Sequence, residues 1–359
     1  MTRWTLTAAL LLLTPACSED VGAGGSQDGG DGALLAVEVP ASGSVHVRLA
    51  TPEVVVPTGD AAASTAWDLA FSGYDVFTNS GLSGPGDGGA LPLSLEDYRA
   101  GDLPSTPFLL EDEPGGAFSS WYAYDGAQHV LFSRFHVHAI EHEGRSWKLQ
   151  ILGFYGEVDR APLAGIYHLR YAEVLPEGPG PTVELAALDA TAGGDVDDDA
   201  AKSACLDLAR GEALPLTPAE ASASTAWHVC FRRSLIRVNG ELGGPGAARG
   251  ADLHEAETRS ESLAQVKART AASETARFDA VGYDTLTDPA VVYRGDHITT
   301  AFTGRWLEPG ANPPAPASDA AWLIQGADGA SRFVAVIERF EGATDISPGR
   351  VIIRVKQLE

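Results

Sequence analysis

The chain of 359 residues is longer than one ordinary hydrophobic core supports and matches two domains of roughly 150 residues each. Its 49 acidic side chains against 25 Lys and Arg give a formal net charge of −24, which repels phosphate backbones and anionic lipid headgroups. The composition therefore argues against nucleic-acid partners and is typical of a soluble, acidic surface.

The first residues are predicted to be an export signal and not part of the fold. The apolar stretch from Trp4 to Leu13 is too short to cross a bilayer, and the small residue Ala16 directly precedes Cys17. Residues 1–17 thus resemble a bacterial lipoprotein signal peptide, although the leucine of the lipobox lies one position farther from the cysteine than usual. Cleavage by an ordinary signal peptidase is the alternative. In the lipoprotein interpretation Cys17 is lipidated and anchors the chain in the outer membrane or cell surface, and residues 18–33 form a flexible tether.

The chain contains an internal duplication. The sequence Ala-Ser-Thr-Ala-Trp at residues 63–67 recurs unchanged at 223–227, and Gly-Pro-Gly at 84–86 recurs at 244–246 with the same spacing of 160 residues. Such a match over an ungapped stretch predicts two copies of one folding unit. We therefore expect one domain for each copy.

The ends of the two copies also match, but at a larger spacing. The stretches Gly165–Tyr171 and Gly349–Val355 align at a spacing of 184, so the second copy holds 24 inserted residues. The polar segment from Ala251 to Arg277 is the expected insertion, and its charges predict a helix on the domain surface. The predicted domains are residues 34–176 and 204–359.

Short alternating apolar runs separated by Gly and Pro predict many short strands. They occur in the same order in the two copies: 44–56, 67–77, 129–140, 146–155 and 165–174, then 205–216, 227–238, 320–325, 332–340 and 350–355. The expected fold is mostly β, with two tandem antiparallel β domains and a short helical insertion in the second. Residues 177–203 are predicted to be an acidic Pro/Gly linker, and their Asp195–Asp199 run lacks the turn glycine and closing glutamate of a calcium loop.

Beyond the export signal the only cysteines are Cys205 and Cys230. An even pair in an exported chain is most simply a disulfide. A metal site or a catalytic thiol is the less favoured alternative, because neither cysteine lies beside a second soft ligand.

Several stretches of the first copy resemble a known family. The sequence Ser-Thr-Ala-Trp-Asp-Leu-Ala-Phe at 64–71, followed by Thr-Asn-Ser-Gly at 78–81, resembles the opening signature of the HmuY family. Residues 147–155 look like the family's Lys-hydrophobic-Gln-hydrophobic strand, and residues 165–171 look like its final aromatic strand.

This resemblance covers roughly residues 34–176 well and 204–359 more weakly. It implies two tandem HmuY-like β domains and an exported lipoprotein of the bacterial surface. It also implies a haemophore-like function, in which haem is held between two axial side chains. The implied partners are haem, haem-carrying proteins and an outer-membrane receptor.

The histidines are candidate ligands, since haem iron needs imidazole, thioether or thiolate donors and the only Met is the initiator. Five of the nine histidines fall late in the first copy: His129, His136, His138, His142 and His168. On a strand alternate residues share a face, so His136 and His138 point the same way, joined by His142 if the extended path continues. Aligned with the last four of these histidines, the second copy has Ala321, Leu323, Ala327 and Ile352. The cluster is therefore specific to the first copy.

Three interpretations of the cluster remain open. In the first, His136 or His138 pairs with His168 around haem, and Arg134 or Arg170 meets the propionates. The ring then stacks on one of the aromatic residues Trp121, Tyr122, Tyr124, Phe154 and Tyr155. In the second, zinc or copper is the ligand, held by His136, His138, His142 and His168. In the third, the histidines are half-exposed strand residues without a ligand.

The sequence shows no motif for catalysis. It has no Gly-x-Ser-x-Gly elbow, no His-Glu-x-x-His helix and no phosphate-binding loop. We therefore expect a binding protein and not an enzyme, with a structural or protein-interaction module as the alternative.

Overall fold

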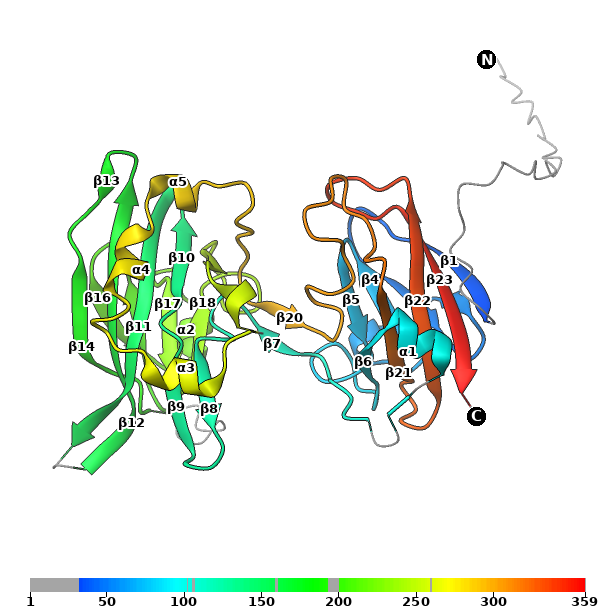
Figure 1. Ribbon diagram of the computed structural model, residues 1–359, viewed down its shortest axis with the longest axis horizontal. Helices are drawn as coiled ribbons and strands as arrows, with labels where there is room; N and C mark the ends of the chain where they lie inside the picture. Colours follow the sequence, from blue (N-terminus) through cyan, green and yellow to red (C-terminus); the bar gives the residue numbers. More distant parts are fainter. Residues whose placement is uncertain are drawn as a thin grey trace, which may run out of the picture.

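The computed structural model describes residues 32–358 except 102, 105–106, 159–160, 193–199 and 259. The fold is mostly β with antiparallel sheets, as predicted. The strands form two lobes joined by a narrow ribbon (Figure 1). The predicted signal peptide, Cys17 and most of the tether lie outside the described residues.

Lobe I consists of residues 32–112 and 300–358 and is a sandwich of two sheets. Its large sheet has the order β1 (Ala33–Glu38), β23 (Arg350–Leu358), β22 (Arg332–Glu341), β21 (Ala320–Gln325) and β6 (Gly89–Ser94). Its small sheet has the order β3 (Glu53–Val55), β2 (Val45–Arg48), β4 (Leu69–Ser72) and β5 (Asp75–Thr78). A 3-10 turn, η1 (Ala61–Ala63), and a helix, α1 (Leu95–Ala100), accompany the sheets. Alternate residues such as Val47, Phe71 and Trp322 fill the core between them.

Lobe II consists of residues 116–296 and repeats this architecture. Its large sheet has the order β13 (Gly178–Pro179), β12 (Ala161–Leu175), β11 (Arg145–Val158), β10 (Val137–His142) and β19 (Arg249–Asp252), and β14 (Val183–Asp189) also pairs with β12. Its small sheet has the order β16 (Glu212–Leu216), β15 (Ser203–Asp207), β17 (Val229–Arg232) and β18 (Leu235–Val238). The hairpin of β8 (Tyr122–Asp125) and β9 (Val130–Ser133), the helix α2 (Pro218–Ser222) and the turn η2 (Glu255–Glu257) complete the sandwich.

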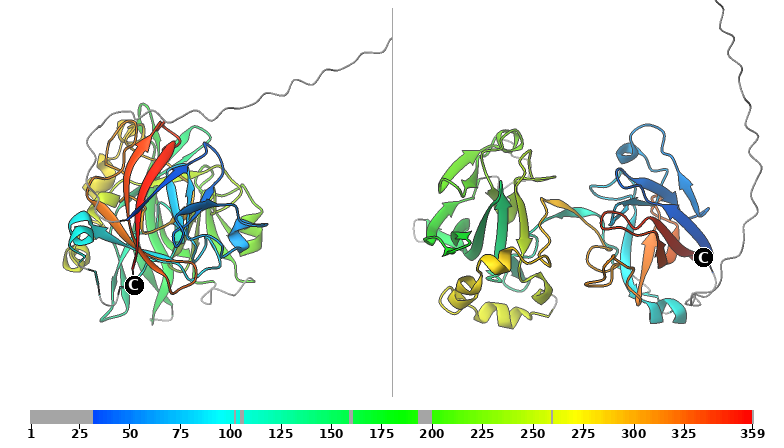
Figure 2. Two further views of the ribbon diagram at one scale, coloured as in Figure 1. Left: turned by 90° about the vertical axis from the view of Figure 1, so that its right-hand side faces the viewer. Right: turned by 90° about the horizontal axis from the view of Figure 1, so that it is seen from above.

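The ribbon between the lobes is formed by β7 (Glu113–Gly115) and β20 (His297–Thr299), which pair antiparallel. Seen from above, this ribbon connects the two separate sandwiches (Figure 2). An ion pair supplements it, because Arg294 reaches Asp75 of lobe I at 3.0 Å and Glu241 of lobe II at 3.2 Å. The chain thus crosses between the lobes once in each copy.

Because of this crossing, the two copies exchange halves. Strands β1 to β6 of the first copy pair with β21 to β23 of the second, through β1 with β23 and β6 with β21. Strands β10 to β12 of the first copy pair with β14 and β19 of the second. The predicted domains, 34–176 and 204–359, are therefore wrong. The repeat identifies equivalent strands, but it does not show which copy supplies the partner strand.

The segment predicted as a linker, 177–203, contributes two strands to the fold. It contains β13 and β14, and β14 pairs with β12 as β1 pairs with β23. Leu185 and Leu188 both pack on the lobe II core although they are three residues apart, because the pairing of β12 with β14 shifts register between them, so simple alternation did not reveal this strand. The Asp195–Asp199 run lies outside the described residues.

The insertion in the second copy forms three short helices, α3 (Leu263–Ala268), α4 (Thr275–Ala280) and α5 (Tyr283–Leu286). They extend beyond the predicted 251–277; α4 and α5 cover the outer face of the large sheet of lobe II, and α3 lies on the β8–β9 hairpin (Figure 1). Phe278 packs there against the sheet residues Val137 and Ala172. The buried Lys148 of β11 donates to the backbone oxygens of Phe278 and Val281, each at 2.8 Å, and so caps the end of α4.

The residues repeated in both copies serve the fold. Asn239 donates to the carbonyls of Ser224 and Trp227, and its Oδ1 accepts from the N–H of Gly246. The matching Asn79 makes the same three hydrogen bonds in lobe I. The first glycine of each Gly-Pro-Gly loop is required because a Cβ there would collide with this asparagine.

Candidate functional site

The first predicted ligand, His136, belongs to a buried charge network. Its Nδ1 lies 2.8 Å from Asp252 and its Nε2 lies 3.4 Å from Glu261. Burial would raise the pKa of Glu261, but hydrogen bonds from Arg134 and Arg269 outweigh burial and hold that pKa below its usual value. The predicted propionate partner Arg134 is therefore engaged with a carboxylate, at 2.6 Å.

One group in the described residues satisfies the spacing of a three-ligand metal site. Ligand atoms of His136, Glu257 and Glu261 lie within 4.8 Å of one another. The two carboxylates are already neutralised by guanidinium groups, since Arg269 contacts both and Arg277 contacts Glu257. A divalent cation would have to displace these positive charges, so we interpret the group as an ion-pair network.

The second predicted ligand, His138, is a core residue. It shares the inner face of β10 with Ile140, as the alternation predicts, while Val137 and Ala139 face the helices. Its ring lies against Phe118 with the centroids 4.2 Å apart, and its Nδ1 lies 2.9 Å from the carbonyl of Ala117. Burial lowers the pKa of His138 to about 4 and keeps the ring neutral.

The structure does not bring His168 to these histidines. Strand β11 separates β12 from β10, and the neighbours Tyr167 and Leu169 face the core while His168 faces outward. Its Nε2 lies 2.6 Å from Glu184 on the surface. The structure therefore does not bring His168 together with His136 or His138, the pairs predicted to ligate haem. Tyr155 is also exposed, and its hydroxyl accepts from the N–H of Leu131.

The fourth predicted ligand, His142, lies at a cavity. A two-residue turn, Glu143–Gly144, joins β10 to β11 with φ of 50° and 74°, so His142 ends β10 directly opposite Arg145. The ring of His142 meets the ring of His228 edge to face, with the centroids 4.9 Å apart at 84°. The first residue belongs to the first copy and the second residue to the second copy, so the exchange of halves creates this contact.

His228 is buried and incompletely partnered. Its Nδ1 accepts from the N–H of Leu208 at 3.2 Å and lies 3.6 Å from Asp207. Its Nε2 has no hydrogen-bond partner within the described residues. Burial, reinforced by the neighbouring His142, lowers the pKa of His228 to about 4 against the opposing charge of Asp207. The ring is therefore neutral at physiological pH.

In lobe I the equivalent position is fully hydrogen-bonded. The residue equivalent to His228 is Asp68, whose carboxylate accepts from the N–H of Leu49 at 2.8 Å and of Ala327 at 2.9 Å. The repeat places Ala327 where lobe II has His142. The imidazole of His228 accepts from the N–H of Leu208, as Asp68 accepts from that of Leu49. It has no counterpart to the hydrogen bond from Ala327, so its Nε2 is unpartnered within the described residues and lies beside a second imidazole.

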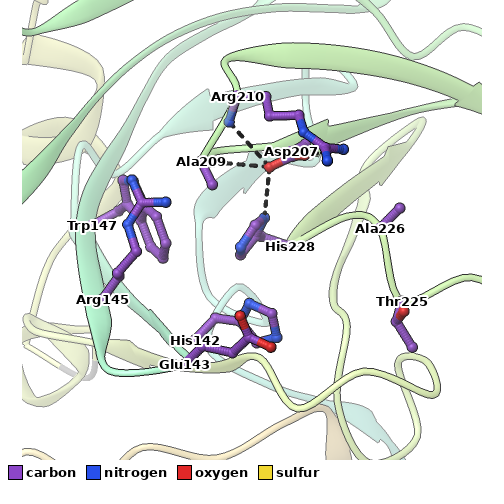
Figure 3. Close-up of a pocket in the computed structure, with 10 residues that line it drawn as sticks. All are labelled: His142, Glu143, Arg145, Trp147, Asp207, Ala209, Arg210, Thr225, Ala226 and His228. Atoms are coloured by element: carbon purple, nitrogen blue, oxygen red, sulfur yellow. Dashed lines mark hydrogen bonds and ion pairs between the residues drawn. The ribbon is translucent and has the colours of Figure 1, made fainter.

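The two histidines line a cavity of about 270 Å³. Figure 3 shows its wall, in which Asp207 stands over His228 and Trp147 and Arg145 lie to one side. The Trp147 ring lies 4.9 Å from that of His228. The full lining is His142, Glu143, Arg145, Trp147, Asp207, Ala209, Arg210, Thr225, Ala226 and His228.

Sequence reasoning included His142 but missed His228, because the second copy was treated as lacking histidine ligands. A signal was present. Directly after the repeated Ala-Ser-Thr-Ala-Trp, the first copy has Asp68 and the second copy has His228. This replacement of an aspartate by a histidine within the repeated stretch could have indicated the site.

The disulfide between Cys205 and Cys230 is confirmed. It joins β15 to β17 at directly opposed positions, close to the buried Trp227. The link therefore braces the small sheet that carries His228.

No protein-family model matches this chain, and no curated protein matches it. The resemblance to the HmuY family thus rests on the stretches quoted above. Among the described helices none is both long and apolar enough to cross a membrane.

Proposed function

We propose that the protein is a non-catalytic binding protein, exported and lipid-anchored at the cell surface, that holds a transition-metal centre with His142 and His228. The observation that carries this proposal is the unpartnered Nε2 of the buried, neutral His228 beside a second imidazole. An unpaired buried polar atom is costly, and a ligand that uses it offsets this cost.

The chemistry of the pair suits a metal. Imidazole must be neutral to ligate, and the lowered pKa of His228 meets this requirement. Zinc, copper and nickel favour such nitrogen donors. Ligation through Nε2 requires the tautomer with its proton on Nδ1, which would then point its N–H at Asp207, 3.6 Å away, and give up the hydrogen bond from the N–H of Leu208.

A free divalent ion, zinc or copper, is the favoured source of the metal centre. The imidazoles are already in edge-to-face contact, which suits a single ion more than a macrocycle placed between them. Haem is the second candidate, because Trp147 and the cation Arg210 line the same cavity and suit the ring and a propionate, whereas Arg145, which also lines it, is held by two hydrogen bonds to Glu173. Haem binding would require the cavity to widen, and its ligand pair would be His142 with His228.

Titrations of the purified, metal-stripped chain test the proposal. Zn²⁺ is followed by calorimetry, Cu²⁺ by electron paramagnetic resonance, and haemin by its Soret band. We expect one tight Cu²⁺ or Zn²⁺ site with two imidazole nitrogens, weakened by about tenfold or more in His142→Gln and in His228→Asn. The asparagine can still accept from the N–H of Leu208. The control His168→Gln changes a surface histidine and should bind as the parent does.

The outcomes separate the two sources. A low-spin haemin spectrum that both substitutions abolish supports the metal-centre proposal with haem as its source. Binding of neither ion nor haemin, or binding that survives both substitutions, overturns the proposal. Mass spectrometry of the mature chain tests the anchor, since a diacylglycerol adduct on Cys17 is expected and an unmodified terminus contradicts it.

A further inference from the structure

A second site is indicated by a pair of equivalent aspartates that flank the ribbon. Asp112 directly precedes β7 in lobe I, and Asp296 directly precedes β20 in lobe II. Both are buried, and the N–H groups of Leu82 and Leu242 donate to their respective backbone carbonyls. The two side chains therefore start from the same backbone position, and their surroundings can be compared directly.

The carboxylate of Asp112 is well supplied with donors. It accepts from the N–H of Thr78 at 3.0 Å, from the Thr78 hydroxyl at 2.8 Å and from the Ser83 hydroxyl at 2.6 Å. These bonds use both carboxylate oxygens. Lobe I therefore satisfies its buried acid from its own side chains.

The carboxylate of Asp296 lacks the equivalent donors. Thr78 is replaced by Val238 and Ser83 by Gly243, so both hydroxyls are gone. Within the described part of the chain the Asp296 side chain accepts one hydrogen bond, from the N–H of Val238 at 3.2 Å. Burial raises the pKa of Asp296 to about 7, against the hydrogen bond from Val238 and the charge of Arg237.

A cavity of about 270 Å³ adjoins this carboxylate in lobe II. Its wall includes three aromatic residues of the first copy, Phe118, Trp121 and Tyr122, and the apolar Ile236 of the second. The cavity lies beside the ribbon, since β7 residues and Thr299 also line it. It is distinct from the cavity of His142 and His228, with which it shares no residue.

We propose that this cavity binds a small organic cation, with a primary ammonium group on Asp296 and an apolar or aromatic body against Phe118, Trp121 and Tyr122. An ammonium supplies the donors and the positive charge that the buried carboxylate lacks. Aromatic walls favour both the cation and an apolar body. Small-molecule sites combine apolar and aromatic walls with a few placed polar groups, and this wall carries the charged Glu113, Arg237 and Asp296 beside its aromatic residues.

The exposed Arg237 at this cavity is the cation that competes with the ligand. Glu241 adds negative charge near Asp296, and Glu113 lines the cavity from the ribbon. Removing the competing cation should strengthen ammonium binding. Arg237→Gln is therefore expected to tighten binding, whereas loss of the Asp296 charge weakens it.

Calorimetry with 2-phenylethylamine on the full chain tests the proposal, and 2-phenylethanol serves as the uncharged probe. We expect Asp296→Asn to weaken binding of the amine by about tenfold or more, and 2-phenylethanol to bind weakly or not at all. The matched control Asp112→Asn changes the equivalent acid in the other lobe and should leave amine affinity unchanged. Circular dichroism confirms that each variant is folded.

Proton release provides a second measurement. Because a bound ammonium lowers the pKa of Asp296, binding near neutral pH should release protons, seen as a dependence of the heat on buffer ionisation enthalpy. The titration is repeated in His228→Asn, which lacks a proposed metal ligand. Amine binding should be unchanged in this variant, so the result does not depend on whether the metal site exists. Equal affinity for amine and alcohol, unchanged affinity in Asp296→Asn, or no binding of the amine overturns the proposal.

Discussion

The paired asparagines allow a sharp test of which repeated residues hold the fold. Asn239→Ala removes three buried hydrogen bonds, to Ser224, Trp227 and Gly246. At about 1 kcal/mol each, with the cost of stranding their buried partners added, the loss is about 3 to 5 kcal/mol. With a urea m-value of about 2 kcal/mol/M for a domain of this size, the midpoint should fall by about 1.5 to 2.5 M.

The assay is urea-dependent hydrogen exchange followed by mass spectrometry, which reports each lobe from its own peptides. Asn239→Ala should lower the midpoint of lobe II and leave lobe I nearly unchanged. Asn79→Ala makes the same change in lobe I and should give the reverse result with similar size. A loss under about 1 kcal/mol in both variants would refute the reasoning, because buried hydrogen bonds of this kind cannot be so weak.

Two further predictions concern the exchanged architecture. Reducing the Cys205–Cys230 disulfide should destabilise lobe II by about 3 kcal/mol and leave lobe I unaffected, as the same exchange assay would show; equal losses in both lobes would contradict this. The pair Glu38→Cys with Arg350→Cys should oxidise to a disulfide within one chain, since the two positions are opposed across β1 and β23. Glu38→Cys with Ile166→Cys is the pair expected if each copy folded on itself, and efficient cross-linking of that pair would disprove the exchange.

Local features of the fold could be predicted from the sequence. Alternating apolar runs located most strands, and the composition and export signal indicated the disulfide between Cys205 and Cys230. The pairing of distant strands could not be predicted in the same way. Each strand of one copy has an equivalent in the other with similar alternation, so β1 is suited to pair with β12 as well as with β23.

The site was predicted in part for a related reason. Alternation placed His136 and His138 on one face, but it could not show that His138 packs on Phe118 or that His136 meets Asp252, because these partners come from other segments. His142 was predicted to act with other histidines of the first copy. Its true neighbour, His228, lies in the other copy, and only the exchange of halves brings the two rings together.

The crossing of the chain at β7 and β20 has an evolutionary consequence. Each sandwich is built from both copies. The effect of a substitution in the first half of one copy on stability therefore depends on the residues that pack against it from the second half of the other copy. Lys148 with the inserted helix that it caps, and the two imidazoles at the cavity, are contacts of this kind, since each joins a residue of one copy to a residue of the other. Loss of either copy would remove strands from both sandwiches, so the two copies can be kept or lost only as a pair.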